Sequence, residues 1–249
     1  MALSLLTKLQ TLILNTPELT QYGTVPSESG LLTELKRLQL ISFDMAGDIP
    51  SKLAVLTSLR ELQIQGEFKG QFYQEILWHM TLLEILCIGG VSDFFVDTVL
   101  FSHIFRSNSN LQILSLEYNG LQATLPATMG LLTQLEFLDL WHTKLNGTIP
   151  TEIGNCHKLE RLILGVNNLS SGLPTELGKL TKLVELSLYN NYLSTMVPFE
   201  LGLLTDLELL MLQCSNWRTR IPRVFRGSVT IGSMGLWRWC RRNCVRFRR

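Results

Sequence analysis

The stretch Leu135-Glu-Phe-Leu-Asp-Leu-Trp-His-Thr-Lys-Leu-Asn-Gly-Thr-Ile-Pro-Thr-Glu-Ile-Gly154 contains two short patterns that recur along the chain. It opens with Leu-x-x-Leu-x-Leu and continues to Gly-x-Ile-Pro. Prolines follow one another at intervals of 24 residues, at Pro126, Pro150, Pro174, Pro198 and Pro222. A fixed period of this size is typical of a solenoid. The sequence therefore predicts one stack of similar turns, with any functional site on its surface.

The leucine pattern occurs nine times, and a degraded tenth copy, Ile231/Met234/Leu236, keeps the 24-residue step after Leu207. The first leucines of the nine copies are Leu9, Leu35, Leu59, Leu83, Leu111, Leu135, Leu159, Leu183 and Leu207. We expect residues 1–236 to form a solenoid of nine repeats plus a degenerate tenth. Residues 237–249 are expected to form a basic Arg/Trp tail that is disordered or an artefact of the reading frame.

Each repeat predicts a short strand and a return segment. The Leu-x-Leu alternation places two leucines on one face of a strand. Strands from successive repeats then make a parallel sheet with a leucine core behind it. In the return segment, the proline fixes its φ angle and donates no hydrogen bond. We expect Gly130 and Gly202 to end a short helical turn, where glycine is favoured after the last helical residue. The predicted fold class is an α/β repeat solenoid.

Asparagines stand three residues after the last strand leucine in three repeats, at Asn119, Asn167 and Asn191. An inward asparagine at this place can bond the backbone groups that the end of the sheet leaves unpaired. We therefore expect these residues to form a structural ladder. Thr143 takes this place in one repeat, and Pro17, Phe43, Glu67 and Val91 take it in the first four.

The repeat resembles the leucine-rich repeat family, specifically its plant-type class of 24-residue repeats, with the full motif between Leu135 and Gly154. The resemblance covers about residues 5–236 and is strongest over 111–212. It implies a right-handed horseshoe or superhelix, with a parallel sheet on the concave side and short helices, 3-10 turns or loops on the convex side. It also implies non-catalytic recognition of a protein or peptide, because the class is best known from ectodomains of receptor-like proteins and receptor-like kinases.

A receptor-like protein would place this chain outside the cell or at its surface, and otherwise the chain is expected in the cytoplasm. No apolar stretch approaches the roughly 18 residues that span a bilayer. The sequence also lacks a kinase signature and the cysteine-pair caps common in these receptors. Terminal turns of a solenoid need a polar cover. The missing caps favour a fragment of a longer protein and predict self-association through the uncapped ends.

The candidate ligand-binding residues occupy the positions around the strand leucines, which we expect to be exposed on the concave face. Aromatic and charged side chains are combined there, as in binding hot spots. We expect affinity from the aromatic residues and specificity from the others. The set comprises Glu117, Tyr118, Phe137, Asp139, Trp141, His142, Arg161, Glu185 and Tyr189. The alternative is an ordinary concave face, on a structural or scaffolding repeat that has no specific ligand.

Catalysis, cofactors and metal ions are not expected. His142 stands near Asp139 in sequence and near Glu117 on the adjacent strand, but no Ser or Cys nucleophile accompanies them. The five cysteines show neither disulfide-framework nor zinc-ligand spacing. Cys156 takes the place of a leucine and is expected to be a buried small hydrophobe.

Two sequons, at Asn146 and Asn168, lie in return segments that should be exposed. They are candidate glycosylation sites if the chain is secreted. The alternative is that Asn-x-Thr simply arises from the repeat consensus.

Residues 89–110 interrupt the pattern, with four extra residues and no Ile-Pro. We expect Phe94, Phe95, Phe101 and Phe105 to cover the core from the convex side, and a partner contact is the alternative.

The formal net charge of +1 conceals an asymmetry, because the chain from Arg218 onward has ten arginines and no acidic residue. The arginines and aromatics there are suited to nucleic acid or an anionic membrane, which we keep as a minor alternative.

Overall fold

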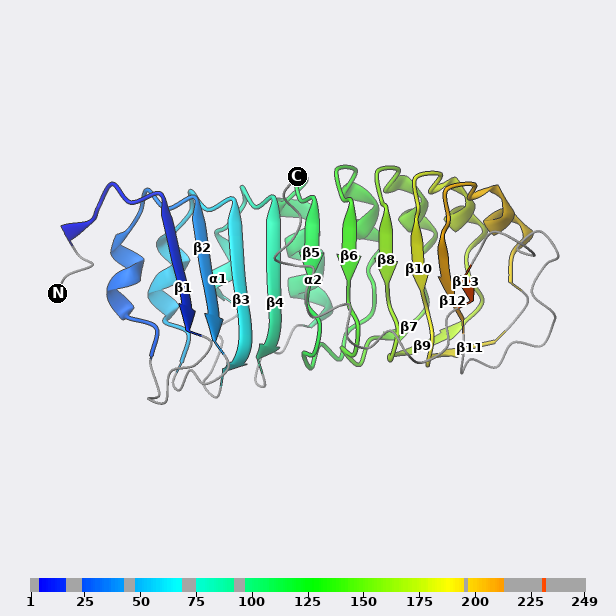
Figure 1. Cartoon of the computed structure of the whole chain (residues 1–249), viewed down its shortest axis with the longest axis horizontal. Coiled ribbons are helices and arrows are strands. Elements are labelled where there is room, and N and C mark those ends of the chain that lie inside the picture. The colour runs from blue at the N-terminus through cyan, green and yellow to red at the C-terminus, as the bar shows by residue number, and fades with distance from the viewer. Residues whose placement is uncertain are drawn as a thin grey trace.

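Figure 1 shows the computed structural model of the chain, which describes residues 5–16, 24–42, 48–68, 75–91, 97–194, 197–212 and 230–231. Its main element is a parallel sheet of ten strands, in which neighbouring strands follow chain order. The strands are β1 (Thr11–Thr16), β2 (Arg37–Ser42), β3 (Glu61–Phe68), β4 (Ile85–Val91), β5 (Ile113–Ser115), β6 (Phe137–Asp139), β8 (Arg161–Ile163), β10 (Glu185–Ser187), β12 (Leu209–Met211) and β13 (Thr230–Ile231). The predicted α/β leucine-rich repeat solenoid is confirmed.

The return segments form the second layer, behind the sheet in Figure 1. Most carry a five-residue 3-10 helix that begins directly after a repeat proline: η2 (Ser27–Leu31), η3 (Ser51–Val55), η4 (Ala127–Leu131), η5 (Thr151–Asn155), η6 (Thr175–Lys179) and η7 (Phe199–Leu203). Two irregular repeats carry the α-helices α1 (Glu75–Trp78) and α2 (Thr98–Ser107) instead. A second sheet, β7 (Asn146–Gly147), β9 (Asn168–Ser171) and β11 (Tyr192–Leu193), joins three return segments and was missed in the sequence.

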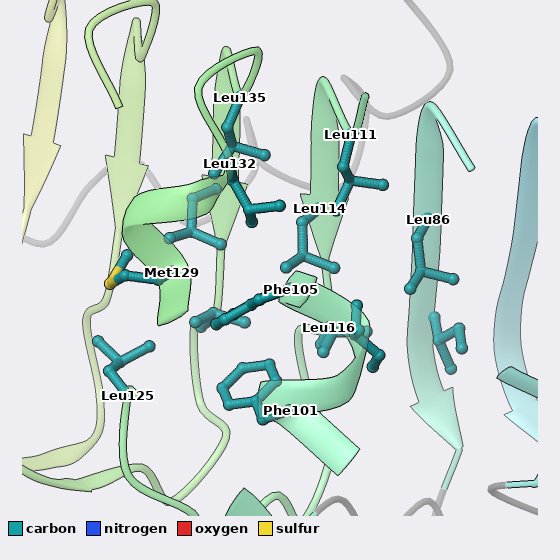
Figure 2. Close-up of a cluster of buried hydrophobic side chains, with 14 of the residues drawn as sticks. Leu86, Phe101, Phe105, Leu111, Leu114, Leu116, Leu125, Met129, Leu132 and Leu135 are labelled. Carbon is teal, nitrogen blue, oxygen red and sulfur yellow. The ribbon is translucent and has the colours of Figure 1, made fainter. Parts of the chain in front are cut away.

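The core lies between the two layers. The middle leucines of successive motifs pair across the sheet, as Leu114 does with Leu138 and Leu138 with Leu162, and all three are fully buried. In Figure 2 the rings of Phe101 and Phe105 lie among the sheet leucines. Both rings are fully buried, with centroids 4.7 Å apart. Their predicted role in the core is confirmed. Phe94 and Phe95 lie outside the described residues.

The repeat glycines have a different role from the one predicted. Gly130 and Gly202 lie inside the 3-10 helices η4 and η7, each followed by a further helical residue. A Cβ on Gly130 would stand 2.8 Å from the carbonyl oxygen of Glu152 in the next helix, and one on Gly154 would stand 2.9 Å from that of Glu176. Glycine is therefore required because consecutive 3-10 helices touch backbone to side chain. It does not end the helices.

The three asparagines make the hydrogen bonds predicted for them. The amide nitrogen of Asn167 donates to the carbonyls of Leu140, at 2.8 Å, and Leu164, at 3.0 Å, and its oxygen accepts from two backbone N–H groups. Asn191 bridges the carbonyls of Leu164 and Leu188, both at 3.0 Å. Asn119 bonds in the same way to the turn before it. Buried backbone groups at the end of the sheet are thereby satisfied.

A further buried asparagine, Asn108, was not predicted. Its side chain accepts from the N–H of Leu83 at 3.1 Å and donates to the carbonyl of Ile104 at 3.2 Å. It joins the end of helix α2 to the preceding repeat.

The tenth strand does not pair as predicted. The 24-residue step would place Met234 opposite Leu210, but Leu210 pairs with Ile231. The sheet therefore gains its last strand with a spacing of 21 residues, because the repeat pattern has decayed there. Met234, Leu236, the arginine-rich tail and residues 237–249 lie outside the described residues, apart from β13.

Cys156 is fully buried, as predicted, and its thiol contacts the carbonyl of Met129 at 3.4 Å. Burial raises the pKa of the Cys156 thiol to about 11, so the group stays neutral and unreactive at ordinary pH.

Candidate functional site on the concave face

Three neighbouring strands place the candidate residues in a grid. One row is Phe137, Arg161 and Glu185, which pair across β6, β8 and β10. The next row is Asp139, Ile163 and Ser187. Side chains alternate along a strand, so both rows face away from the buried leucines and onto the concave side. Just beyond the strands, Trp141, Gly165 and Tyr189 hold the third row.

The concave face carries an apolar cluster of its own. Phe137, Trp141 and Ile163 form its buried part, and Ile113, Val166 and Tyr189 pack against them. This cluster is separate from the main core. Residues at equivalent places on adjacent strands stand close enough for large side chains to touch. The arrangement produces a dense apolar surface instead of isolated side chains.

The expected exposure of several candidate residues was wrong. Phe137 is 8%, Trp141 9% and Glu185 7% exposed, and Asp139 is also buried. They lie on the predicted face, but neighbouring side chains crowd over them. Tyr118 and His142 are exposed, as expected, and Arg161 and Tyr189 are partly exposed.

Gly165 explains how two large rings fit in one row. A Cβ on this residue would lie 2.7 Å from Cε1 of Tyr189 and 3.3 Å from Cδ1 of Trp141. Both rings therefore occupy the space that a side chain at position 165 would fill. Sequence reasoning passed over Gly165, although a glycine between two aromatics at the same repeat position was the available signal.

Tyr118, Trp141 and His142 form an aromatic ridge beside the cluster. The Tyr118 ring meets Trp141 edge to face, with centroids 4.4 Å apart at 89°. The His142 ring lies 5.3 Å from Tyr118 and 5.8 Å from Trp141. Within the described part of the chain, His142 makes no hydrogen bond to Asp139. The pair therefore does not form the dyad that a general base would need.

A left-handed corner of the backbone presents the ridge. Tyr118, His142, Val166 and Asn190 stand 24 residues apart and all have positive φ angles, of 57°, 52°, 57° and 53°. Gly66 and Gly90 hold the same place in earlier repeats, also with positive φ. Residues with a Cβ seldom adopt this conformation. The corner turns the chain out of the sheet and toward the asparagine ladder.

Asp139 has a structural role that the sequence did not reveal. Its Oδ1 accepts a hydrogen bond of 2.9 Å from the backbone N–H of Trp141. The carboxylate thus fixes the turn that carries Trp141. Its predicted contribution to ligand specificity stays a prediction.

Glu185 is a buried carboxylate on the concave face. Burial raises the pKa of its carboxyl group, and the positive charge of Arg161 on the neighbouring strand lowers it in part. The charged form is therefore less stable here than in water.

The N-terminal half of the concave face has a different character. Arg37 pairs with Glu61 at 2.5 Å across β2 and β3, and Gln63 donates a hydrogen bond to Glu61. Arg60 pairs with Glu84 at 2.5 Å. Each pair joins residues 24 apart in the sequence, which is the signal by which the pairing could have been predicted. Opposite charges on adjacent strands neutralise one another there.

Other predicted features lie elsewhere. Asn146 and Asn168 pair across β7 and β9 in the second sheet, and both side chains are exposed. Their glycosylation stays a prediction. Across the described ranges, no group of three or more His, Cys, Asp or Glu side chains is arranged to hold a metal ion. In the same ranges, no helix has the length and apolar character to cross a membrane.

Solved structures with the same fold include several plant receptors. The Arabidopsis thaliana receptor kinase GASSHO1/SCHENGEN3 ectodomain, in complex with CASPARIAN STRIP INTEGRITY FACTOR 2, is 25% identical with a TM-score of 0.67, and the match covers 86% of this chain and 28% of that one. A TDR receptor is 25% identical with a TM-score of 0.70, covering 87% of this chain and 41% of the other.

The Arabidopsis receptor kinase HAESA, in complex with the peptide hormone IDA and the co-receptor SERK1, is also 25% identical, with a TM-score of 0.66 over 83% of this chain and 38% of that one. This chain thus spans well under half the length of these receptor ectodomains. A search of curated proteins finds no match. The family profile described as a leucine-rich repeat region matches residues 101–230, which is more than half of the sequence. The chain belongs to the leucine-rich repeat family.

Proposed function

We propose that this chain recognises a protein or peptide through its concave face, within a receptor-like protein at the cell surface or outside the cell. The observation that carries the proposal is the apolar cluster of Phe137, Trp141 and Ile163 on the sheet face, away from the main core. Large apolar surfaces outside a core are typical of interaction sites. The ridge of Tyr118, Trp141 and His142 borders this cluster and is partly accessible.

The mechanism is binding to a preformed surface. The cluster stands on three hydrogen-bonded strands, and the turn that carries Trp141 is held by Asp139. A ligand therefore meets aromatic groups that are already ordered, so binding costs little side-chain entropy. Aromatic side chains of this kind provide much of the free energy in hot spots. No catalytic step is part of the proposal.

The receptor context rests on likeness to other proteins. Structures of GASSHO1/SCHENGEN3 and HAESA contain a bound factor or peptide hormone. This chain covers only part of their length, so its ligand and location are proposed by analogy. The scaffold alternative predicts no preferred binding site on the concave face.

The test is a selection of random 12-residue peptides on phage against the folded chain, followed by calorimetry with the recovered peptides. We expect Tyr118→Ala and Trp141→Ala to weaken binding at least tenfold. Tyr192→Ala is the matched control, because Tyr192 is an exposed tyrosine on the second sheet. Circular dichroism checks folding, since Trp141 is buried. Peptides that depend on Tyr192 but not on Tyr118 or Trp141 would contradict the proposal.

A further inference from the structure

The C-terminal half of the concave face carries an excess of negative charge. The positions that flank the motif leucines between Leu111 and Leu212 hold six acidic residues and one arginine. The acidic residues are Glu117, Glu136, Asp139, Glu160, Glu185 and Glu208, and the arginine is Arg161. The equivalent positions of the N-terminal half hold Lys36, Arg37 and Arg60 against Glu61 and Glu84, which form the ion pairs already described.

Folding brings some of these like charges together. Glu136 and Glu160 hold the same place in successive repeats, and the N–H of Glu160 donates to the carbonyl of Glu136 at 2.8 Å. Like charges placed directly opposite each other on neighbouring strands destabilise a sheet. In the N-terminal half the same row carries Arg60 and Glu84, which attract each other. The acidic character of the C-terminal half therefore costs stability that the alternating pattern avoids.

Glu185 provides the second, independent observation. It holds the same row as Glu61, and each has an arginine at the paired position of the preceding strand. Arg37 and Glu61 form an ion pair at 2.5 Å. Among the described residues, Glu185 forms neither a hydrogen bond nor an ion pair within 4.0 Å, although only 7% of it is exposed. A buried carboxylate without a partner is costly, and a cation that reaches it recovers much of that cost.

We propose that the ligand of the concave face is a basic peptide, one of whose arginine or lysine side chains pairs with Glu185. This inference rests on the proposed function and names its ligand class. A guanidinium group can satisfy both carboxylate oxygens at once. Tyr189 and Trp141 border the site on the same face, and aromatic rings attract cations placed over them. The surrounding acids attract a basic peptide during approach, and an acidic peptide is repelled.

The experiment uses the full chain and two labelled pools of nine-residue peptides with randomised neutral positions. One pool carries a central arginine, and the other carries citrulline, its neutral isostere. Binding is measured by fluorescence polarisation at low and high salt. We expect the arginine pool to bind the wild-type chain at least tenfold more tightly than the citrulline pool, with a preference that shrinks as salt rises.

Two variants separate pairing from general charge. Glu185→Gln should remove the preference for arginine almost completely. Glu160→Gln removes the same charge from an exposed position on the same face and should reduce the preference by less than threefold. Both proteins are checked for folding by circular dichroism.

The outcomes distinguish this inference from the proposed function. Equal binding of the two pools to the wild-type chain would overturn the basic-ligand proposal and leave peptide recognition standing. Equal effects of the two substitutions would overturn the role of Glu185. Binding of neither pool, together with failure of the phage selection, would instead contradict the proposed function itself.

Discussion

Replacing Gly165 by alanine tests whether the concave aromatic rings are held in place by the absence of a side chain. The added Cβ would stand 2.7 and 2.8 Å from two atoms of the Tyr189 ring. Ordinary contact needs about 3.4 Å or more, so the ring has to move by roughly 0.7 Å. It also has to leave its packing against Trp141. Overpacking of this kind costs about 1–3 kcal/mol.

The assay has two readouts, the free energy of unfolding in urea and the affinity for a selected peptide. We expect Gly165→Ala to lower the first by about 1–3 kcal/mol. The shift of Tyr189 and Trp141 should weaken affinity at least tenfold. Gly120→Ala is the matched control, because no atom lies within 4 Å of the Cβ it would add. It should leave stability unchanged or raise it by about 0.4–1 kcal/mol. A Gly165→Ala protein that matches the control in both readouts would refute this account.

Three further predictions concern the same repeats. Leu162→Ala should lower the free energy of unfolding by about 2–5 kcal/mol, because it opens a cavity in a fully buried row; a loss below about 1 kcal/mol in urea titration would be incompatible with that burial. Val166→Asn should raise stability by about 1 kcal/mol, because a β-branched residue is strained at a φ of 57° where Asn190 sits at 53°, and a lower melting temperature would show that apolar contacts of Val166 outweigh the strain. Glu185 has a pKa above its ordinary value of 4.5 when folded, with Arg161 as the charged group that faces it and the uncharged Leu209 on the other side. The folded state therefore binds this proton more tightly, so stability should fall as pH rises from about 4.5 through the raised pKa. The stability of Glu185→Gln should lack this decline, and parallel stability curves for the two proteins between pH 4 and pH 7 would contradict it.

The repeat architecture could be predicted because its determinants are local. The leucines alternate over a few residues, and the same spacing recurs through most of the chain. The asparagine ladder followed from the same logic, since its partners are backbone groups that every repeat supplies. The prediction weakened where the pattern itself decays, so Ile231 was placed opposite the wrong leucine.

The concave face was harder to predict because its properties depend on contacts between repeats. The sequence assigned Phe137, Trp141 and Glu185 to the correct side of the sheet but overestimated their exposure. Burial there depends on how neighbouring rings lean, and Gly165 decides that for two of them. The role of Gly130 was wrong for a similar reason. It was assigned from a rule about single helices, whereas the constraint comes from Glu152 in the next one.

The glycine in each 3-10 helix also has a consequence for the curvature of the whole molecule. A solenoid bends when the spacing between repeats differs on its two sides, and the strands on one side are held at a fixed spacing of about 4.8 Å. On the other side, the close approach of Gly130 to Glu152 and of Gly154 to Glu176 limits the spacing of the helices. A bulkier residue at either glycine would spread the outer layer and tighten the bend of the sheet. The distance between ligand contacts on separate strands is thus adjustable from the opposite side of the protein.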